Sequence, residues 1–259
     1  MTHYRIASFV AMQFIMMIVA ITGVIQPLFS QLHGEKNPEK IEKVFFLSSK
    51  ISICITSFVG FGLIAWGSPF IERWMGPAYL DAYPCLVILV AGCIFDLWQS
   101  PSVTLLYAIS KHRFYALCNV LEGIANLILS LLLVKSFGIV GVALGTFIPM
   151  AIIRLIVQPI YVCRVASFSY RKYFWMMGQS LMVVILSLVI PLLITVCYIE
   201  PNYSALMQLG LVSFAVYSVS IWLFEFTPGE IQIIKKILPN IFLQREGSTT
   251  ISDIKGNRN

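Results

Sequence analysis

The chain has 259 residues, of which 58% are hydrophobic and 12% are charged. An average soluble domain carries about twice that share of charged residues, so this chain lacks the polar surface that a water-soluble globule needs. We therefore interpret it as an integral membrane protein. The net charge of +6 does not indicate a nucleic-acid partner, because the Lys and Arg residues lie between apolar segments instead of along one basic face.

The sequence shows no sign of a cofactor, a metal site or catalytic chemistry. Its six cysteines are scattered through apolar runs without a C-x-x-C spacing, and its three histidines are isolated from one another. It also lacks a Walker loop, a G-x-G-x-x-G after a strand and an H-E-x-x-H helix. We therefore predict that the protein is not an enzyme and that it binds no cofactor.

Seven apolar stretches are long enough to cross a bilayer as α-helices, which takes roughly 20 residues each. They cover about residues 6–29, 45–71, 84–109, 114–134, 138–163, 174–198 and 205–225. Only short polar breaks separate them, so we predict an all-α, polytopic transmembrane bundle over residues 1–226. The charged stretch from Gln31 to Lys43 is predicted to be a short surface helix before the second span. Four prolines are expected to mark kinks within spans, namely Pro101, Pro149, Pro159 and Pro191.

Residues 227–259 are predicted to lie outside the bilayer, on the cytoplasmic side. The sequence Thr227-Pro228-Gly229-Glu230 is typical of a helix start, with a capping box and a proline at the first helical position. Apolar residues then recur on one helical face, namely Ile231, Ile234, Leu238 and Ile241. This pattern favours an amphipathic helix on the membrane surface, followed by a disordered polar tail.

The distribution of basic residues predicts the orientation of the spans. If the loops alternate between the two sides, most Lys and Arg residues fall on one side, and the other side receives only Arg5, Arg73 and Lys135. The positive-inside rule then places the C-terminus in the cytoplasm and the N-terminus on the outer side of the membrane. We therefore expect further spans upstream of Met1; a short native protein that inserts with its N-terminus outside is the alternative.

The stretch from Phe114 to Met150 has the most informative polar pattern. It is predicted to form two apolar helices joined by a tight turn at residues 135–138. Spacings of three and four residues place a polar stripe on one face of the first helix, made of Asn119, Glu122, Asn126 and Ser130. The second helix begins with Gly138, Gly141 and Gly145 and carries Arg154 further along.

Glu122 and Arg154 are ionisable residues inside predicted spans, where charges are costly and commonly functional. Both lie roughly 12–14 Å from the cytoplasmic ends of their helices, so adjacent antiparallel helices could pair them. The pair could be a structural link within the hairpin. It could also line a cavity, where Arg154 attracts a pyrophosphate while Glu122 tunes the site or carries a coupling cation.

Asp96 lies deeper, in the third span, with Gln99 three positions further along the same predicted face. A carboxylate near the middle of the membrane is the strongest candidate for proton or sodium coupling. The alternative is a neutral carboxyl group buried beside Asn126, which lies at a similar predicted depth. The candidate residues of a substrate or ion path are Asp96, Gln99, Asn119, Glu122, Asn126 and Arg154.

Three short segments resemble motifs of polysaccharide flippases. QPLFSQLHG (26–34) resembles the segment that closes an early helix of the second lobe in these proteins. WMGPAY (74–79) is similar to their W-x-G-x-x-Y loop, and FGIVGVALGT (137–146) to their F-G-I-x-G-A-A-x-G-T helix start. Together, over about residues 20–163, they resemble the Wzx-like exporters of the multidrug/oligosaccharidyl-lipid/polysaccharide superfamily.

The resemblance implies the second lobe plus extra C-terminal helices of a two-lobe flippase. It implies that an undecaprenyl-diphosphate-linked oligosaccharide crosses the inner membrane by alternating access, for polysaccharide or lipopolysaccharide O-antigen biosynthesis. The implied partners are the lipid bilayer, the lipid-linked oligosaccharide and other polysaccharide-assembly membrane proteins. The alternatives are a cation-coupled multidrug exporter of the same superfamily and a non-transporting membrane scaffold or truncated remnant.

Overall fold

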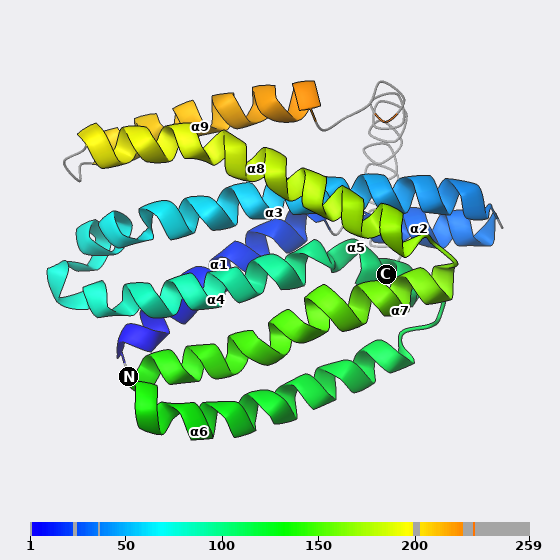
Figure 1. Ribbon diagram of the computed structural model, residues 1–259, viewed down its shortest axis with the longest axis horizontal. Helices are drawn as coiled ribbons and strands as arrows, with labels where there is room; N and C mark the ends of the chain where they lie inside the picture. Colours follow the sequence, from blue (N-terminus) through cyan, green and yellow to red (C-terminus); the bar gives the residue numbers. More distant parts are fainter. Residues whose placement is uncertain (1, 23–24, 36, 199–202, 225–229, 231–259) are drawn as a thin grey trace, which may run out of the picture.

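A computed structural model describes residues 2–22, 25–35, 37–198, 203–224 and 230, and every regular element in them is helical (Figure 1). The α-helices are α1 (Thr2–Thr22), α2 (Ile25–Gly34), α3 (Pro38–Met75), α4 (Tyr83–Trp98), α5 (Ser100–Ala108), α6 (Arg113–Ile152), α7 (Gln158–Ala166), α8 (Tyr170–Tyr198) and α9 (Tyr203–Phe224). A 3₁₀ turn, η1 (Pro77–Ala82), and a π-helical turn, η2 (Ile153–Val157), complete the described elements.

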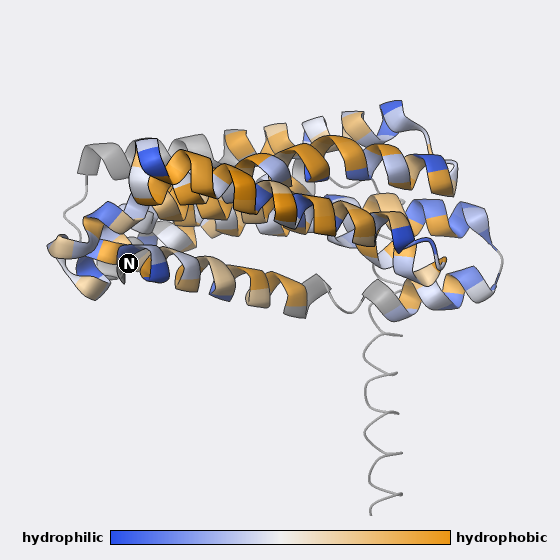
Figure 2. Ribbon diagram, turned by 90° about the horizontal axis from the view of Figure 1, so that it is seen from below, coloured by the Kyte–Doolittle hydropathy of each residue, from blue (hydrophilic) through white to orange (hydrophobic). Residues whose placement is uncertain are grey.

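The helices form a bundle whose described connections alternate between its two ends (Figure 1). Three described stretches are long and apolar enough to cross a membrane, namely Pro38–Met75, Pro77–Ala108 and Arg113–Ala166. The third stretch folds back on itself at Gly138 and therefore contains two antiparallel legs. Hydrophilic residues gather toward both ends of the bundle (Figure 2). These features confirm the predicted fold class, a helical membrane bundle.

The charged stretch before the second span does not form the predicted separate surface helix. The chain turns after Gly34, and residues from Pro38 onward already belong to α3. Asn37 caps this helix because its side-chain oxygen accepts the Lys40 backbone N–H at 3.1 Å, and Pro38 fits the first helical position. With 38 residues α3 is about 57 Å long, so it extends beyond a hydrocarbon core of about 30 Å.

The third span is broken into α4 and α5 at Gln99, two residues before Pro101. Proline has no backbone N–H, so Pro101 cannot donate to the Leu97 carbonyl one turn earlier. The hydroxyl of Ser52 on α3 donates to that carbonyl instead, at 2.8 Å. The predicted kink at Pro101 is therefore a real break, and a neighbouring helix satisfies the carbonyl group that it frees.

Small polar residues let α3 lie close to its neighbours in the centre of the bundle. Five of its hydroxyl-bearing side chains are buried, namely Ser48, Ser49, Ser52, Thr56 and Ser57. Such residues are common between packed membrane helices because they permit close approach and hydrogen bonding. The Trp98 indole N–H donates to the Ser57 hydroxyl at 2.9 Å, which ties α4 to α3, and the Tyr217 hydroxyl donates to the Cys54 carbonyl at 2.6 Å, which ties α9 to α3.

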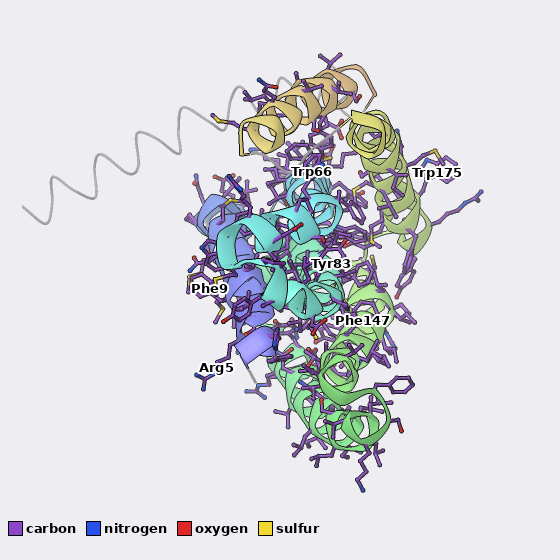
Figure 3. The ribbon with its side chains drawn as sticks, turned by 90° about the vertical axis from the view of Figure 1, so that its left-hand side faces the viewer. Arg5, Phe9, Trp66, Tyr83, Phe147 and Trp175 are labelled. Atoms are coloured by element: carbon purple, nitrogen blue, oxygen red, sulfur yellow. The ribbon has the colours of Figure 1, made fainter. Side chains whose placement is uncertain are left out.

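Large apolar side chains also cover much of the outer surface. Figure 3 shows Phe9 and Trp175 at the periphery, whereas Tyr83 and Phe147 lie between helices. The Trp175 side chain is 76% exposed, and Leu127 on the first leg of α6 is 63% exposed. So many exposed large apolar residues are unusual for a water-soluble protein but suit contact with lipid chains.

The predicted hairpin is present, and glycines hold its two legs together. Gly138 adopts φ 58° and ψ −132°, a backbone conformation that side chains rarely tolerate, and the chain reverses there. A Cβ atom on Gly145 would lie 2.6 Å from the backbone nitrogen of Ser130, and one on Gly141 would collide with the Leu133 carbonyl. The legs therefore pack backbone against backbone near the turn.

The predicted membrane-surface helix and polar tail lie outside the described residues, except for Glu230. The Glu230 carboxylate forms an ion pair with Lys50 of α3 at 3.1 Å. Lys50 lies within the predicted second span, and its side chain is only 13% exposed. Sequence reasoning did not single out this half-buried lysine.

We expect Gly145→Ala to lower the midpoint of thermal unfolding in detergent, by an amount equivalent to about 1–3 kcal/mol for an overpacked contact. The added methyl group meets backbone atoms of Ser130, which cannot rotate away. The matched control is Gly123→Ala on the same helix, where no atom lies within 4 Å of the new Cβ. This control should leave the midpoint unchanged or raise it, and equal losses in both variants would contradict the close packing of the legs.

Candidate functional site

The most unusual feature of the membrane region is a buried cationic side chain, Arg154. It lies in the π-helical turn η2, and Gln158 and Pro159 follow this turn directly. Pro159 cannot donate a backbone hydrogen bond, and its ring crowds the carbonyl one turn earlier, which explains a locally widened helix here. Only 7% of the Arg154 side chain is exposed, so its charge must be balanced by protein groups.

The first leg of α6 provides three of these groups. The Asn119 side-chain oxygen accepts from both terminal nitrogens of Arg154, at 3.2 Å each. The Glu122 carboxylate lies 3.4 Å from Nη2, and the guanidinium lies over the ring of Tyr115, 5.4 Å from its centroid. Tyr115, Asn119 and Glu122 share one helical face because they are separated by four and three residues.

Two further groups come from α4 and α7. The Asp96 carboxylate lies 2.5 Å from Nε of Arg154, the shortest of these contacts. The Gln158 side-chain oxygen accepts from Nη1 at 3.1 Å, one turn along the same segment. Every nitrogen of the guanidinium therefore has an oxygen atom within 3.4 Å. We call these six residues the Arg154 cluster: Asp96, Tyr115, Asn119, Glu122, Arg154 and Gln158.

The Arg154 cluster contains one cation and two carboxylates, so with all three ionised it carries one excess negative charge. The two carboxylates differ in access, because the Asp96 side chain is 35% exposed and that of Glu122 is 14% exposed. Glu122 is thus enclosed within the hairpin, whereas Asp96 is the part of the cluster that an ion or a water molecule can reach.

The predicted proximity of Glu122 and Arg154 is confirmed by their ion pair. The alternative that placed a neutral Asp96 beside Asn126 is not supported, because the Asp96 carboxylate contacts Arg154. The Asn126 side-chain oxygen accepts from the hydroxyls of Ser130 and Thr146, at 2.9 and 3.3 Å, and so joins the two legs nearer their turn. The polar stripe of the first leg therefore faces the second leg along its length.

Gln99 is predicted to share a face with Asp96, but the two side chains have different partners. α4 ends at Trp98, and the Gln99 N–H still donates to the Asp96 carbonyl at 3.0 Å. Gln99 is fully buried, and its side-chain oxygen accepts from the hydroxyls of Ser102 and Tyr173, at 2.9 and 3.2 Å. It links α5 to α8 and does not take part in the Arg154 cluster.

Sequence reasoning missed Tyr115 and Gln158 as members of the cluster. Both carry a signal that is readable in the sequence, because each lies four residues along a helix from a residue already singled out, Asn119 or Arg154. The partnership of Asp96 with Arg154 carries no such signal, since it joins separate helices.

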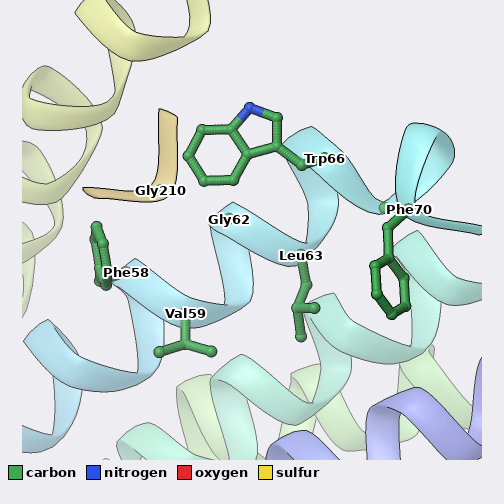
Figure 4. A pocket seen from close by; sticks show the side chains of 8 residues that line it. Phe58, Val59, Gly62, Leu63, Trp66, Phe70 and Gly210 are labelled. Carbon is green, nitrogen blue, oxygen red and sulfur yellow. The ribbon is translucent and has the colours of Figure 1, made fainter. Parts of the chain in front are cut away.

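Away from the cluster, an apolar groove of about 280 Å³ lies between α3 and α9 (Figure 4). Phe58, Val59, Leu63, Trp66 and Phe70 supply its side chains, and no charged residue lines it among those that the structure describes. A groove of this kind on a membrane helix bundle offers room for lipid chains but provides no polar group that would select a ligand.

A comparison with curated proteins finds a distant relative. The chain is 28% identical over 167 residues to the "Probable low-salt glycan biosynthesis flippase Agl15" of Haloferax volcanii. The matched region covers 62% of this chain and 34% of the relative, so the chain spans about a third of the length of that protein. No family model matches the chain, and no solved structure matches it. The similarity supports a flippase-like family for this membrane protein.

We expect Arg154→Met to destabilise the protein by about 3–5 kcal/mol, because it leaves Asp96 and Glu122 without their cation in an apolar environment. The triple variant Asp96→Asn/Glu122→Gln/Arg154→Met removes all three charges and should recover much of this loss. Thermal unfolding in detergent measures both effects, with Arg164→Met, an exposed arginine at the end of α7, as the control. A triple variant less stable than Arg154→Met would contradict the ionic account.

Proposed function

We propose that this protein takes part in moving a lipid-linked oligosaccharide across the cell inner membrane, as a flippase or as a major part of one. The proposed cargo is an undecaprenyl-diphosphate-linked oligosaccharide destined for polysaccharide or lipopolysaccharide O-antigen biosynthesis. The function is transport without covalent catalysis. The distant similarity to a glycan biosynthesis flippase and the helical membrane bundle support this proposal.

The observation that carries the proposal is the partly exposed Asp96 carboxylate within a membrane-spanning helix. A carboxylate near the middle of a bilayer is costly, and such groups face a water-filled cavity or a protein partner. About a third of the Asp96 side chain is exposed, so that side of α4 is expected to border a hydrated space and not lipid chains. A hydrated space inside a helical bundle is what a polar glycan needs in order to cross.

The geometry favours a coupling or linking role for the cluster over direct capture of a pyrophosphate by Arg154. All three guanidinium nitrogens already contact protein oxygens, so Arg154 offers no vacant edge to an anion in this conformation. The cluster instead has an excess negative charge at its accessible end. We propose that Asp96 there takes up a proton or a sodium ion and that this uptake loosens its contact with Arg154.

We expect Arg154→Ala to reduce glycan export by more than it reduces the amount of protein in the membrane. The measurement is surface glycan per unit of membrane protein, in cells that lack any other flippase for the same glycan. Arg164→Ala at the exposed end of α7 is the control and should retain export. Equal loss of export and abundance in Arg154→Ala would leave the cluster with a structural role alone.

The proposed orientation follows from the ends of the bundle at which the basic residues lie. The connections of α5 to α6 and of α7 to α8 lie at one end of the bundle, and those of α3 to α4 and of the two legs of α6 lie at the other (Figure 1). The first two connections contain or flank Lys111, Arg113, Arg164 and Arg171, and the other two flank Arg73 and Lys135. We therefore expect a reporter that is active only in the cytoplasm to be active when it is fused after Asn259. A reporter that is active only in the periplasm should be inactive at the same position. The reverse result would overturn the orientation and, with it, the assignment of the basic end to the cytoplasm.

A further inference from the structure

A second hollow, of about 260 Å³, lies at the basic end of the bundle, where α2, α3, α5 and α7 meet. Its wall is largely apolar and includes Ile41, Leu105, Val165 and Phe168, while Lys111 and His33 add polar groups. It differs in this respect from the groove between α3 and α9, whose described lining has no charged residue. An apolar wall with a cationic rim suits a ligand that is itself amphiphilic.

The positive charge at the rim is not neutralised by nearby acids. The carboxylates of Glu35, Glu39 and Glu42 are each engaged by a lysine, in the pairs Glu35–Lys40, Glu39–Lys43 and Glu42–Lys172. Within the part of the chain that the structure describes, no carboxylate pairs with Lys111. The neighbouring Arg113, Arg164 and Arg171 also have no carboxylate partner there, so this end attracts anions.

The backbone at Lys111 is held in place, which makes the rim a preformed feature. Ser110 adopts a left-handed conformation with φ 57°, and the Lys111 N–H donates back to the Leu106 carbonyl at 2.8 Å. This arrangement ends a helix in the way of a Schellman motif. The Tyr161 hydroxyl of α7 also donates to the Lys111 carbonyl, at 3.0 Å, so α7 fixes the turn from the other side.

We propose that this hollow binds one anionic phospholipid, with the phosphate at Lys111 and an acyl chain against the apolar wall. Basic pockets between membrane helices at the headgroup level recognise anionic headgroups in this way. A zwitterionic lipid would bring its own cation to this basic end beside its phosphate, and a free phosphate would make no use of the wall. The inference does not depend on the proposed transport function.

The test uses the purified full-length chain in detergent, titrated with phosphatidylglycerol and, separately, with phosphatidylcholine of the same acyl chains. Bound lipid is counted by native mass spectrometry, and thermal unfolding reports stabilisation. We expect phosphatidylglycerol to bind and stabilise more than phosphatidylcholine. Lys111→Gln should weaken phosphatidylglycerol binding about fivefold, the loss expected for one basic residue at an anionic headgroup. Lys135→Gln, an exposed lysine at the opposite end, is the matched control and should bind as the unmodified chain does.

Four results would each overturn the proposal. The first is equal binding of the two lipids, and the second is equal loss of binding in Lys111→Gln and Lys135→Gln. The third is stabilisation by inorganic phosphate alone. The fourth is loss of binding in a folded Lys111→Arg, which keeps the charge and should keep binding.

Discussion

The buried guanidinium of Arg154 is the constraint on which the arrangement of the membrane helices depends. A cation with only 7% of its side chain exposed is tolerated among apolar helices only if protein groups replace the water that it loses. Here those groups come from three consecutive crossings of the bundle. Asp96 belongs to α4, Asn119 and Glu122 belong to the first leg of α6, and Gln158 begins α7 directly after η2, which carries Arg154. The cluster thereby fixes how the hairpin lies against the rest of the bundle.

Irregularities of the helices make this arrangement possible. The break at Gln99 ends α4, which carries Asp96, and α5 begins at Ser100. Pro101 leaves the Leu97 carbonyl without its usual helical donor, and the Ser52 hydroxyl donates to that carbonyl instead. The π-helical turn before Pro159 carries Arg154 itself. Both positions lie beside a proline, and at Pro101 a hydroxyl of the neighbouring helix replaces the missing donor. Helix breaks of this kind occur in membrane proteins where the freed backbone groups find protein partners, and they are common at functional sites.

Much of this arrangement could be predicted from the sequence, because the signals are local. The length of the apolar stretches predicts the spans, the glycines after Phe137 predict the turn, and the spacing of Asn119, Glu122 and Asn126 predicts a common face. The pairing of Glu122 with Arg154 follows from equal depth in adjacent helices. The partner of Asp96 could not be found in this way, because its predicted depth is greater than that of Arg154 and matches that of Asn126 instead. The partners of Gln99, Ser102 and Tyr173, could not be found either, because Tyr173 lies on a separate helix.

The most direct test of the ion pair at the centre of the bundle exchanges the charges of Asp96 and Arg154. The single variants Asp96→Arg and Arg154→Asp should each lower the unfolding temperature in detergent, since each places like charges together. The double variant restores one cation facing two carboxylates across the same helices. We predict that it unfolds at a higher temperature than either single variant. A double variant that is as unstable as the two losses added together would show that Asp96 and Arg154 do not interact, and would contradict the role of Arg154 in fixing the bundle.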